Sequence, residues 1–102
     1  MVARVASFEG IDIGQAQRTM DEAEAIVRPL IAGLTGYRGH LELVSQAGDV
    51  LSITLFDSSA DAEAAEETFD EELPRKLGGL FSGWSGRRTG VEVYDVLGEG
   101  RA

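Results

Sequence analysis

The stretch YRGHLELVSQAGDVLSITLFD, residues 37–57, decides the fold. Residues 37–46 and 50–57 are each predicted to form a β-strand, because apolar and polar side chains alternate along them. Between them stands Ala47-Gly48-Asp49, a short turn that contains glycine. This stretch therefore predicts an antiparallel β-hairpin in the middle of the chain.

One strand and one helix are predicted before the hairpin. Residues 2–9 alternate in the manner of a strand. Asp12, followed three residues later by Gln15, fits the capping box of a helix N-terminus. From there apolar residues recur at helical spacing as far as Leu34, with Pro29 expected to kink the helix because it lacks an N–H donor.

The same order is predicted after the hairpin. Ser58 and Ser59 are favourable N-cap residues for a second helix. Pro74 is expected to divide this helix into two pieces and to lie in the first turn of the second piece. Residues 90–97 are predicted to form the last strand, and residues 98–102 a flexible tail.

The resulting order, β-α-β-β-α-β, predicts an α+β, ferredoxin-like fold. Right-handed crossovers in each half and a hairpin between the halves give a four-stranded antiparallel sheet with both helices on one face. A length of 102 residues suits one domain, which we place at residues 1–97.

Composition excludes several classes of function. A formal net charge of −9, with scattered basic residues, disfavours nucleic acid and anionic membranes as partners. The absence of cysteine excludes disulfides and thiolate metal sites. No signal peptide is recognised and no apolar run approaches the ~20 residues of a membrane span, so a cytoplasmic location is expected.

The strand faces predict self-association. The face assigned to the helix side is the more apolar one: Leu41, Leu43, Leu51, Ile53, Leu55, Val91 and Val93. The opposite face is mixed: Arg38, His40, Glu42, Val44, Val50, Ser52, Thr54, Phe56, Glu92, Tyr94 and Val96. Because apolar area on an exposed sheet face usually has a cover, we expect a homodimer in which two sheets pack against each other.

Two short segments resemble a known family. They are Gly36-Tyr37-Arg38-Gly39-His40 and Ile53-Thr54-Leu55-Phe56-Asp57-Ser58-Ser59-Ala60. Both resemble the dimeric α/β-barrel superfamily, and within it the antibiotic-biosynthesis-monooxygenase-like domains. That family tends to have a Gly-aromatic-x-Gly entry to the second strand and a Trp-x-Ser step into the second helix, which Phe56-Asp57-Ser58 fills with Phe in place of Trp.

The resemblance implies a dimer of ferredoxin-like subunits, each with a pocket between helices and sheet. Members of the family include cofactor-independent oxygenases that act on polycyclic phenols, and haem-degrading enzymes. The haem-degrading branch uses an Asn, a Trp and a His, with the His on the second helix. This chain has no Asn, its only His is His40 on a strand, and Trp84 follows the second helix. These differences argue against the haem-degrading branch.

Few residues are candidates for chemistry, and each has a plainer interpretation. His40 is either a general base or a dimer-interface residue, and Tyr94 is either a hydrogen-bond donor to substrate or a surface residue. The expected walls of a ligand pocket, which are equally candidates for ordinary core packing, are Met20, Phe69, Phe81 and Trp84. The acidic run after Asp57 lacks the alternating ligands of a calcium loop, so no metal site is predicted.

Two functions therefore remain open from the sequence. The first is cofactor-independent binding or oxidation of a hydrophobic aromatic small molecule. The second is a non-catalytic dimeric binding or structural module, favoured by the lack of polar groups that visibly converge on one pocket.

Overall fold

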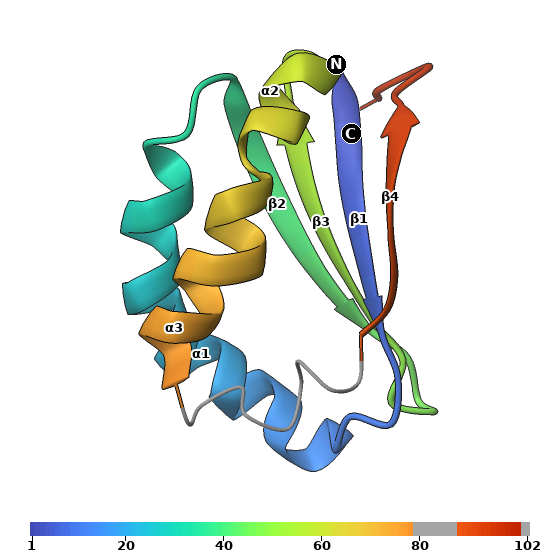
Figure 1. Cartoon of the computed structure of the whole chain (residues 1–102). Coiled ribbons are helices and arrows are strands. Elements are labelled where there is room, and N and C mark those ends of the chain that lie inside the picture. The colour runs from blue at the N-terminus through green and yellow to red at the C-terminus, as the bar shows by residue number, and fades with distance from the viewer. Residues whose placement is uncertain (79–87, 101–102) are drawn as a thin grey trace.

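The computed structural model describes residues 1–78 and 88–100, and it has the predicted order of elements (Figure 1). The strands are β1 (Val2–Phe8), β2 (Tyr37–Val44), β3 (Val50–Phe56) and β4 (Arg88–Asp95). The helices are α1 (Ile13–Ala32), α2 (Ser59–Ala64), the π-helical turn η1 (Thr68–Glu72) and α3 (Leu73–Leu77). Within the described residues, no helix is long and apolar enough to cross a membrane.

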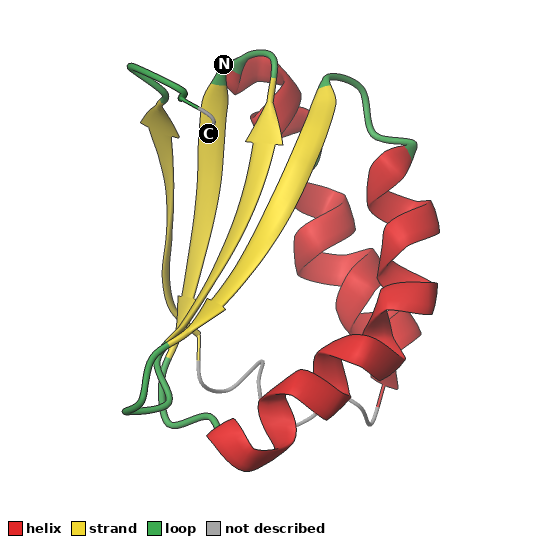
Figure 2. Ribbon diagram, turned by 180° about the vertical axis from the view of Figure 1, so that it is seen from behind, coloured by secondary structure: helices red, strands yellow, loops and turns green. Residues whose placement is uncertain are grey.

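The four strands form one antiparallel sheet in the order β2-β3-β1-β4. All the described helices lie on one face of this sheet, and no described helix covers the other face (Figures 1 and 2). The fold is therefore the α+β, ferredoxin-like arrangement that the sequence predicts.

Local signals explain where the helices begin. The Asp12 side chain accepts a hydrogen bond from the Gly14 N–H at 2.9 Å, which caps α1 as predicted. Ser58 caps α2 in the same way through the Asp61 N–H. Pro74 lies in the first turn of α3, where its missing N–H costs nothing, as predicted.

The core consists of two clusters at opposite ends of the strands. One contains Val2 and the fully buried Phe56, which pack with Ala62 and Ala65. Phe69 packs against this cluster, and its ring meets the Phe56 ring edge to face. The other contains Val50 and Phe8, packed against the start of α1. Because Val2 pairs with Phe56 and Phe8 with Val50, the two clusters hold the ends of the β1–β3 pair.

The predicted faces of β2 and β3 were wrong. Leu41 and Leu43 were assigned to the helix side, yet they are 56% and 46% exposed. Thr54 is buried beneath the helices and pairs directly with His40, so the mixed face is the one that the helices cover. Strict alternation fixes which residues share a face, but it does not say which face the helices cover. Leucine content alone was a misleading guide.

The prediction that Val91 and Val93 of β4 face the helix side of the sheet was correct. Val93 pairs with Arg4 and Val91 with Ala6, both of which are buried on the helix side. The two valines themselves remain exposed at the edge of the sheet. Edge strands are commonly less covered than central ones.

Substitution of Phe56 tests the first core cluster. We expect Phe56→Ala to lower the free energy of unfolding by ~3–5 kcal/mol, since a fully buried ring leaves a cavity. Ile13→Ala, at an exposed apolar position, is the matched control and should cost under ~1 kcal/mol. Urea denaturation followed by circular dichroism measures both, and equal costs for the two variants would contradict this core assignment.

Candidate functional site

A cavity of about 350 Å³ occupies the space between the middle of the sheet and the helices. Its floor comes from β1, β2 and β3, and its walls from α1, η1 and α3. In the described part of the chain, its lining is distinct from the first core cluster except for Phe69, and from the second except for Phe8. The pocket that the family resemblance implies is therefore present.

The floor of the cavity is polar. Arg4, Thr54 and His40 stand side by side on one level of the sheet, each paired with its neighbour. The next level holds Ser52 and Glu42, with Ala6 beside them. Adjacent strands lie ~4.8 Å apart, so neighbouring side chains within each of these two rows are spaced by about the same distance.

The walls are mainly apolar. From α1 come Met20, Val27 and Ile31, and from η1 and α3 come Phe69 and Leu73. An apolar enclosure with a few convergent polar groups is the usual composition of a small-molecule site.

Arg4 places a buried positive charge at one side of the floor. Its guanidinium lies 4.1 Å from the centre of the Phe69 ring and 3.6 Å from the Asp70 carboxylate. Asp70 also accepts a 2.8 Å hydrogen bond from Arg88. Desolvation lowers the pKa of Arg4, against the attraction of Asp70. The guanidinium nevertheless stays charged, because its pKa starts far above neutrality.

His40 lies at the other side of the floor, with both ring nitrogens facing partners. Nδ1 shares a hydrogen bond with the Tyr37 hydroxyl, and Nε2 lies 3.8 Å from a Glu24 oxygen. Burial raises the pKa of Tyr37, so its hydroxyl keeps its proton at neutral pH. Which of the two groups donates in this hydrogen bond depends on the tautomer of His40.

Glu42 is the carboxylate of the floor and accepts a 2.8 Å hydrogen bond from the Ser52 hydroxyl. Its side chain still reaches solvent, but the protein atoms around the carboxylate displace part of its hydration. This desolvation raises the pKa of Glu42 to about 7, against the Ser52 hydrogen bond and with a further contribution from Glu24. A carboxylate with such a pKa exchanges protons at neutral pH.

The structure brings together only part of the predicted site. Met20 and Phe69 line the cavity. His40 also lines it, which corrects the interpretation that it belongs to a sheet-to-sheet interface. Tyr94 pairs with Ala3 on the uncovered face and is 52% exposed, so it does not reach the cavity. The predicted wall residues Phe81 and Trp84 lie outside the described residues.

Sequence reasoning missed Arg4, Glu42, Ser52 and Thr54 as cavity residues. The signal was present, because His40, Glu42, Ser52 and Thr54 alternate with the leucines and so had to share one face. Arg4 within a run of small apolar residues was a second signal, since a charged residue at such a position needs a partner or a function.

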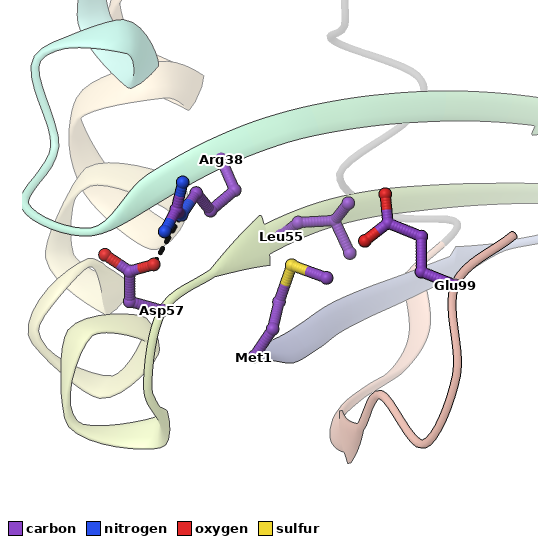
Figure 3. A pocket seen from close by; sticks show the side chains of 5 residues that line it. All are labelled: Met1, Arg38, Leu55, Asp57 and Glu99. Carbon is purple, nitrogen blue, oxygen red and sulfur yellow. Dashed lines mark hydrogen bonds and ion pairs between the residues drawn. The ribbon is translucent and has the colours of Figure 1, made fainter. Parts of the chain in front are cut away.

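A second cavity, of about 430 Å³, lies at one end of the sheet, away from this floor (Figure 3). It is lined by Met1, Arg38, Leu55, Asp57 and Glu99. Arg38 and Asp57 point toward each other and form an ion pair, so their charges are mutually satisfied. Among the described residues, its lining includes none of the apolar helix side chains that enclose the cavity under the helices, which makes that cavity the stronger candidate site.

Comparison with known proteins supports the fold. No model of a known protein family matches the sequence, and no curated protein matches it. Among solved structures, a Bordetella bronchiseptica protein provisionally described as an antibiotic biosynthesis monooxygenase is 13% identical, with a TM-score of 0.67 over 94% of this chain and 96% of that one. A Nitrosomonas europaea protein with the same provisional description is 14% identical, with a TM-score of 0.62 over 95% and 99%.

A third similar structure is described as a dimeric ferredoxin-like protein of unknown function from Jannaschia sp. CCS1. It is 15% identical, with a TM-score of 0.56 over 94% of this chain and all of that one. The likeness to antibiotic-biosynthesis-monooxygenase-like proteins that the sequence predicts is thus confirmed for the fold.

The Glu42 carboxyl offers a direct test of the cavity electrostatics. We expect its carbon resonance to titrate near pH 7, with Glu42→Gln used to assign the signal. Ser52→Ala should raise the midpoint, because the lost hydrogen bond favours the charged form. Glu24→Gln should lower it, because a repelling charge is removed. NMR titration measures all three, and a midpoint that neither variant moves would contradict the assigned causes.

Proposed function

We propose that the cavity binds a hydrophobic polycyclic phenol and promotes its oxidation by dioxygen without a cofactor. The observation that carries this proposal is the pairing of apolar walls with a floor that holds a proton acceptor and a buried cation. A volume of about 350 Å³ is at the lower end of the ~300–1,000 Å³ range of small-molecule sites. The provisional descriptions of the structurally similar proteins agree with this class of reaction.

The first step is removal of a proton. In the described residues, Ser52 occupies one of the roughly four acceptor positions of the Glu42 carboxylate, which leaves others for a substrate. Both nitrogens of His40 already face partners. We therefore assign the role of general base to Glu42, and to His40 the role of positioning Glu24. Arg4 stabilises the resulting anion across the floor.

The second step is a balanced reaction with dioxygen. A polycyclic phenol whose keto tautomer carries an acidic CH₂ group loses one proton to Glu42. The carbanion then transfers electrons to O₂ and forms a carbon–oxygen bond, and the peroxide takes the proton back. The remaining proton of that carbon then leaves, its C–H electrons form the C=O bond as the O–O bond breaks, and the proton joins the departing hydroxide as water, so CH₂ and O₂ become C=O and H₂O. The protein supplies orientation, desolvation and proton transfer.

Binding and turnover of anthrone, a tricyclic compound with such a CH₂ group, test this function. We expect saturable quenching of protein fluorescence and oxygen uptake above the buffer rate. Val27→Trp should abolish binding by filling the cavity, whereas Ala25→Trp on the exposed side of α1 should leave it unchanged. Glu42→Gln should keep binding and lower oxygen uptake by about 100-fold.

The outcomes separate the two functions that the sequence leaves open. Oxygen uptake that depends on Glu42 supports the oxygenase. Saturable binding without oxygen uptake contradicts the oxidation step and favours a binding module. An absence of binding contradicts the proposal as a whole.

We also propose that the chain forms a homodimer through the uncovered face of its sheet. Leu41 and Leu43 are among the exposed apolar residues of this face, and Leu51 and Ile53 pair with them on β3. A run of exposed leucines across neighbouring strands is unusual for a monomer. One structurally similar protein is described as dimeric. The proposed contact is the one expected from the sequence, but through the leucines rather than through His40 and Glu42.

Leu41→Asp tests the dimer by placing a charge within the proposed contact. We expect wild-type protein to elute at twice the mass of one chain at micromolar concentration, and Leu41→Asp to elute as a monomer. Ile13→Asp changes another exposed apolar residue, at the start of α1, and should leave the dimer intact. Size-exclusion chromatography with light scattering measures the masses, and a monomeric wild-type protein would rule out this assembly.

A further inference from the structure

Arg4 stands in the middle of the central strand β1, and only 4% of its surface is exposed. Burial of a charged group is costly unless partners and hydrogen bonds replace its hydration. A guanidinium carries five N–H donors in a fixed plane, so a buried arginine requires several hydrogen-bond acceptors around it.

The partners of Arg4 do not meet those requirements. Within residues 1–78 and 88–100, Nε is fully buried and has no hydrogen-bond partner. The Asp70 carboxylate lies 3.6 Å from the guanidinium, which is an ion pair beyond normal hydrogen-bond length. The same Asp70 oxygen accepts a 2.8 Å hydrogen bond from Arg88. One carboxylate therefore serves two guanidinium groups at close range, and Glu66 adds a further attraction that is weaker than the repulsion from Arg88.

Other carboxylates of the cavity are too far away to neutralise Arg4. Glu42 belongs to β2, which is separated from β1 by β3. Two strand spacings amount to ~10 Å. Glu24 faces His40 on the same distant side and forms an ion pair with Arg28. The intervening β3 contributes only the uncharged Ser52 and Thr54. The floor thus has a cationic side at Arg4 and a proton-accepting side at Glu42.

We propose that Arg4 is an anion subsite, and that the ligand of this cavity is an aromatic molecule carrying an anionic oxygen, either a carboxylate or an ionised hydroxyl. The inference rests on the proposed function and narrows its substrate class. The anionic oxygen meets the guanidinium beside the Phe69 ring, whose face also lies 4.1 Å from Arg4. The aromatic body lies along the apolar walls, and its second polar group reaches toward Glu42.

A matched pair of ligands tests the anion subsite by calorimetry. 2-Naphthoate carries a carboxylate, and 2-naphthamide is its uncharged equivalent of nearly the same shape. We expect wild-type protein to bind the acid about 10- to 100-fold more tightly than the amide, as a charge-assisted contact implies. 2-Naphthol compared between neutral and alkaline pH distinguishes an ionised hydroxyl from a carboxylate as the preferred anion.

Three variants assign the preference to Arg4. Arg4→Met keeps much of the side-chain volume and should remove the preference for acid over amide while amide binding persists. Arg4→Lys keeps the charge without the fork of donors and should retain part of the preference, which covers the case in which Arg4→Met fails to fold. Arg18→Met changes an exposed arginine of α1 and should leave both affinities unchanged.

The results distinguish failure of this inference from failure of the proposed function. Equal affinity for acid and amide in the wild type, or a preference that survives in Arg4→Met, overturns the anion subsite alone. Failure of every aromatic probe to bind overturns the proposed function, and the subsite with it. A preference for the acid that falls in the order wild type, Arg4→Lys, Arg4→Met supports the subsite.

Discussion

The cavity floor depends on the register in which β1 pairs with β3. Arg4 faces Thr54 and Ala6 faces Ser52, so the polar groups of both strands reach the helix side together. A slip of one residue would turn Arg4 toward solvent and carry Val5 under the helices. The register is held by its two ends, because Val2 with Phe56 and Phe8 with Val50 belong to separate buried clusters. The packing that gives stability thus also positions the groups that give chemistry.

The same two clusters explain why a cavity exists at all. Alanines dominate the buried helix positions, with Ala16 near one end of the sheet and Ala62 and Ala65 near the other. Small side chains let a helix approach a sheet closely at its ends. Between these points the wall residues of α1 and α3 meet polar side chains of the floor and leave space above them. Large side chains in place of Ser52 and Thr54 would have filled part of this space.

The sequence predicted the elements well because their signals are local. The glycine turn of the hairpin, the caps at Asp12 and Ser58, and the position of Pro74 each depend on a few neighbouring residues. The faces of β2 and β3 were not predictable in this way, because both alternating sets contain apolar residues and the choice depends on where the helices pack. The prediction of the cavity residues depended on the prediction of the strand faces. Glu42 and Arg4 were therefore missed, whereas Met20 and Phe69 were predicted and do line the cavity.

An acidic protein with an anion subsite is not a contradiction. The net charge of −9 is spread over the chain, and at physiological ionic strength exposed charges are largely screened beyond ~8 Å. Arg4 is buried, so its interaction with a ligand in the cavity is screened much less. What a ligand experiences is the local balance of Arg4 and Arg88 against the carboxylate of Asp70 and the more weakly interacting Glu66. Alternation along the strands makes this possible, because it puts the charged groups on one face and the leucines proposed for self-association on the other.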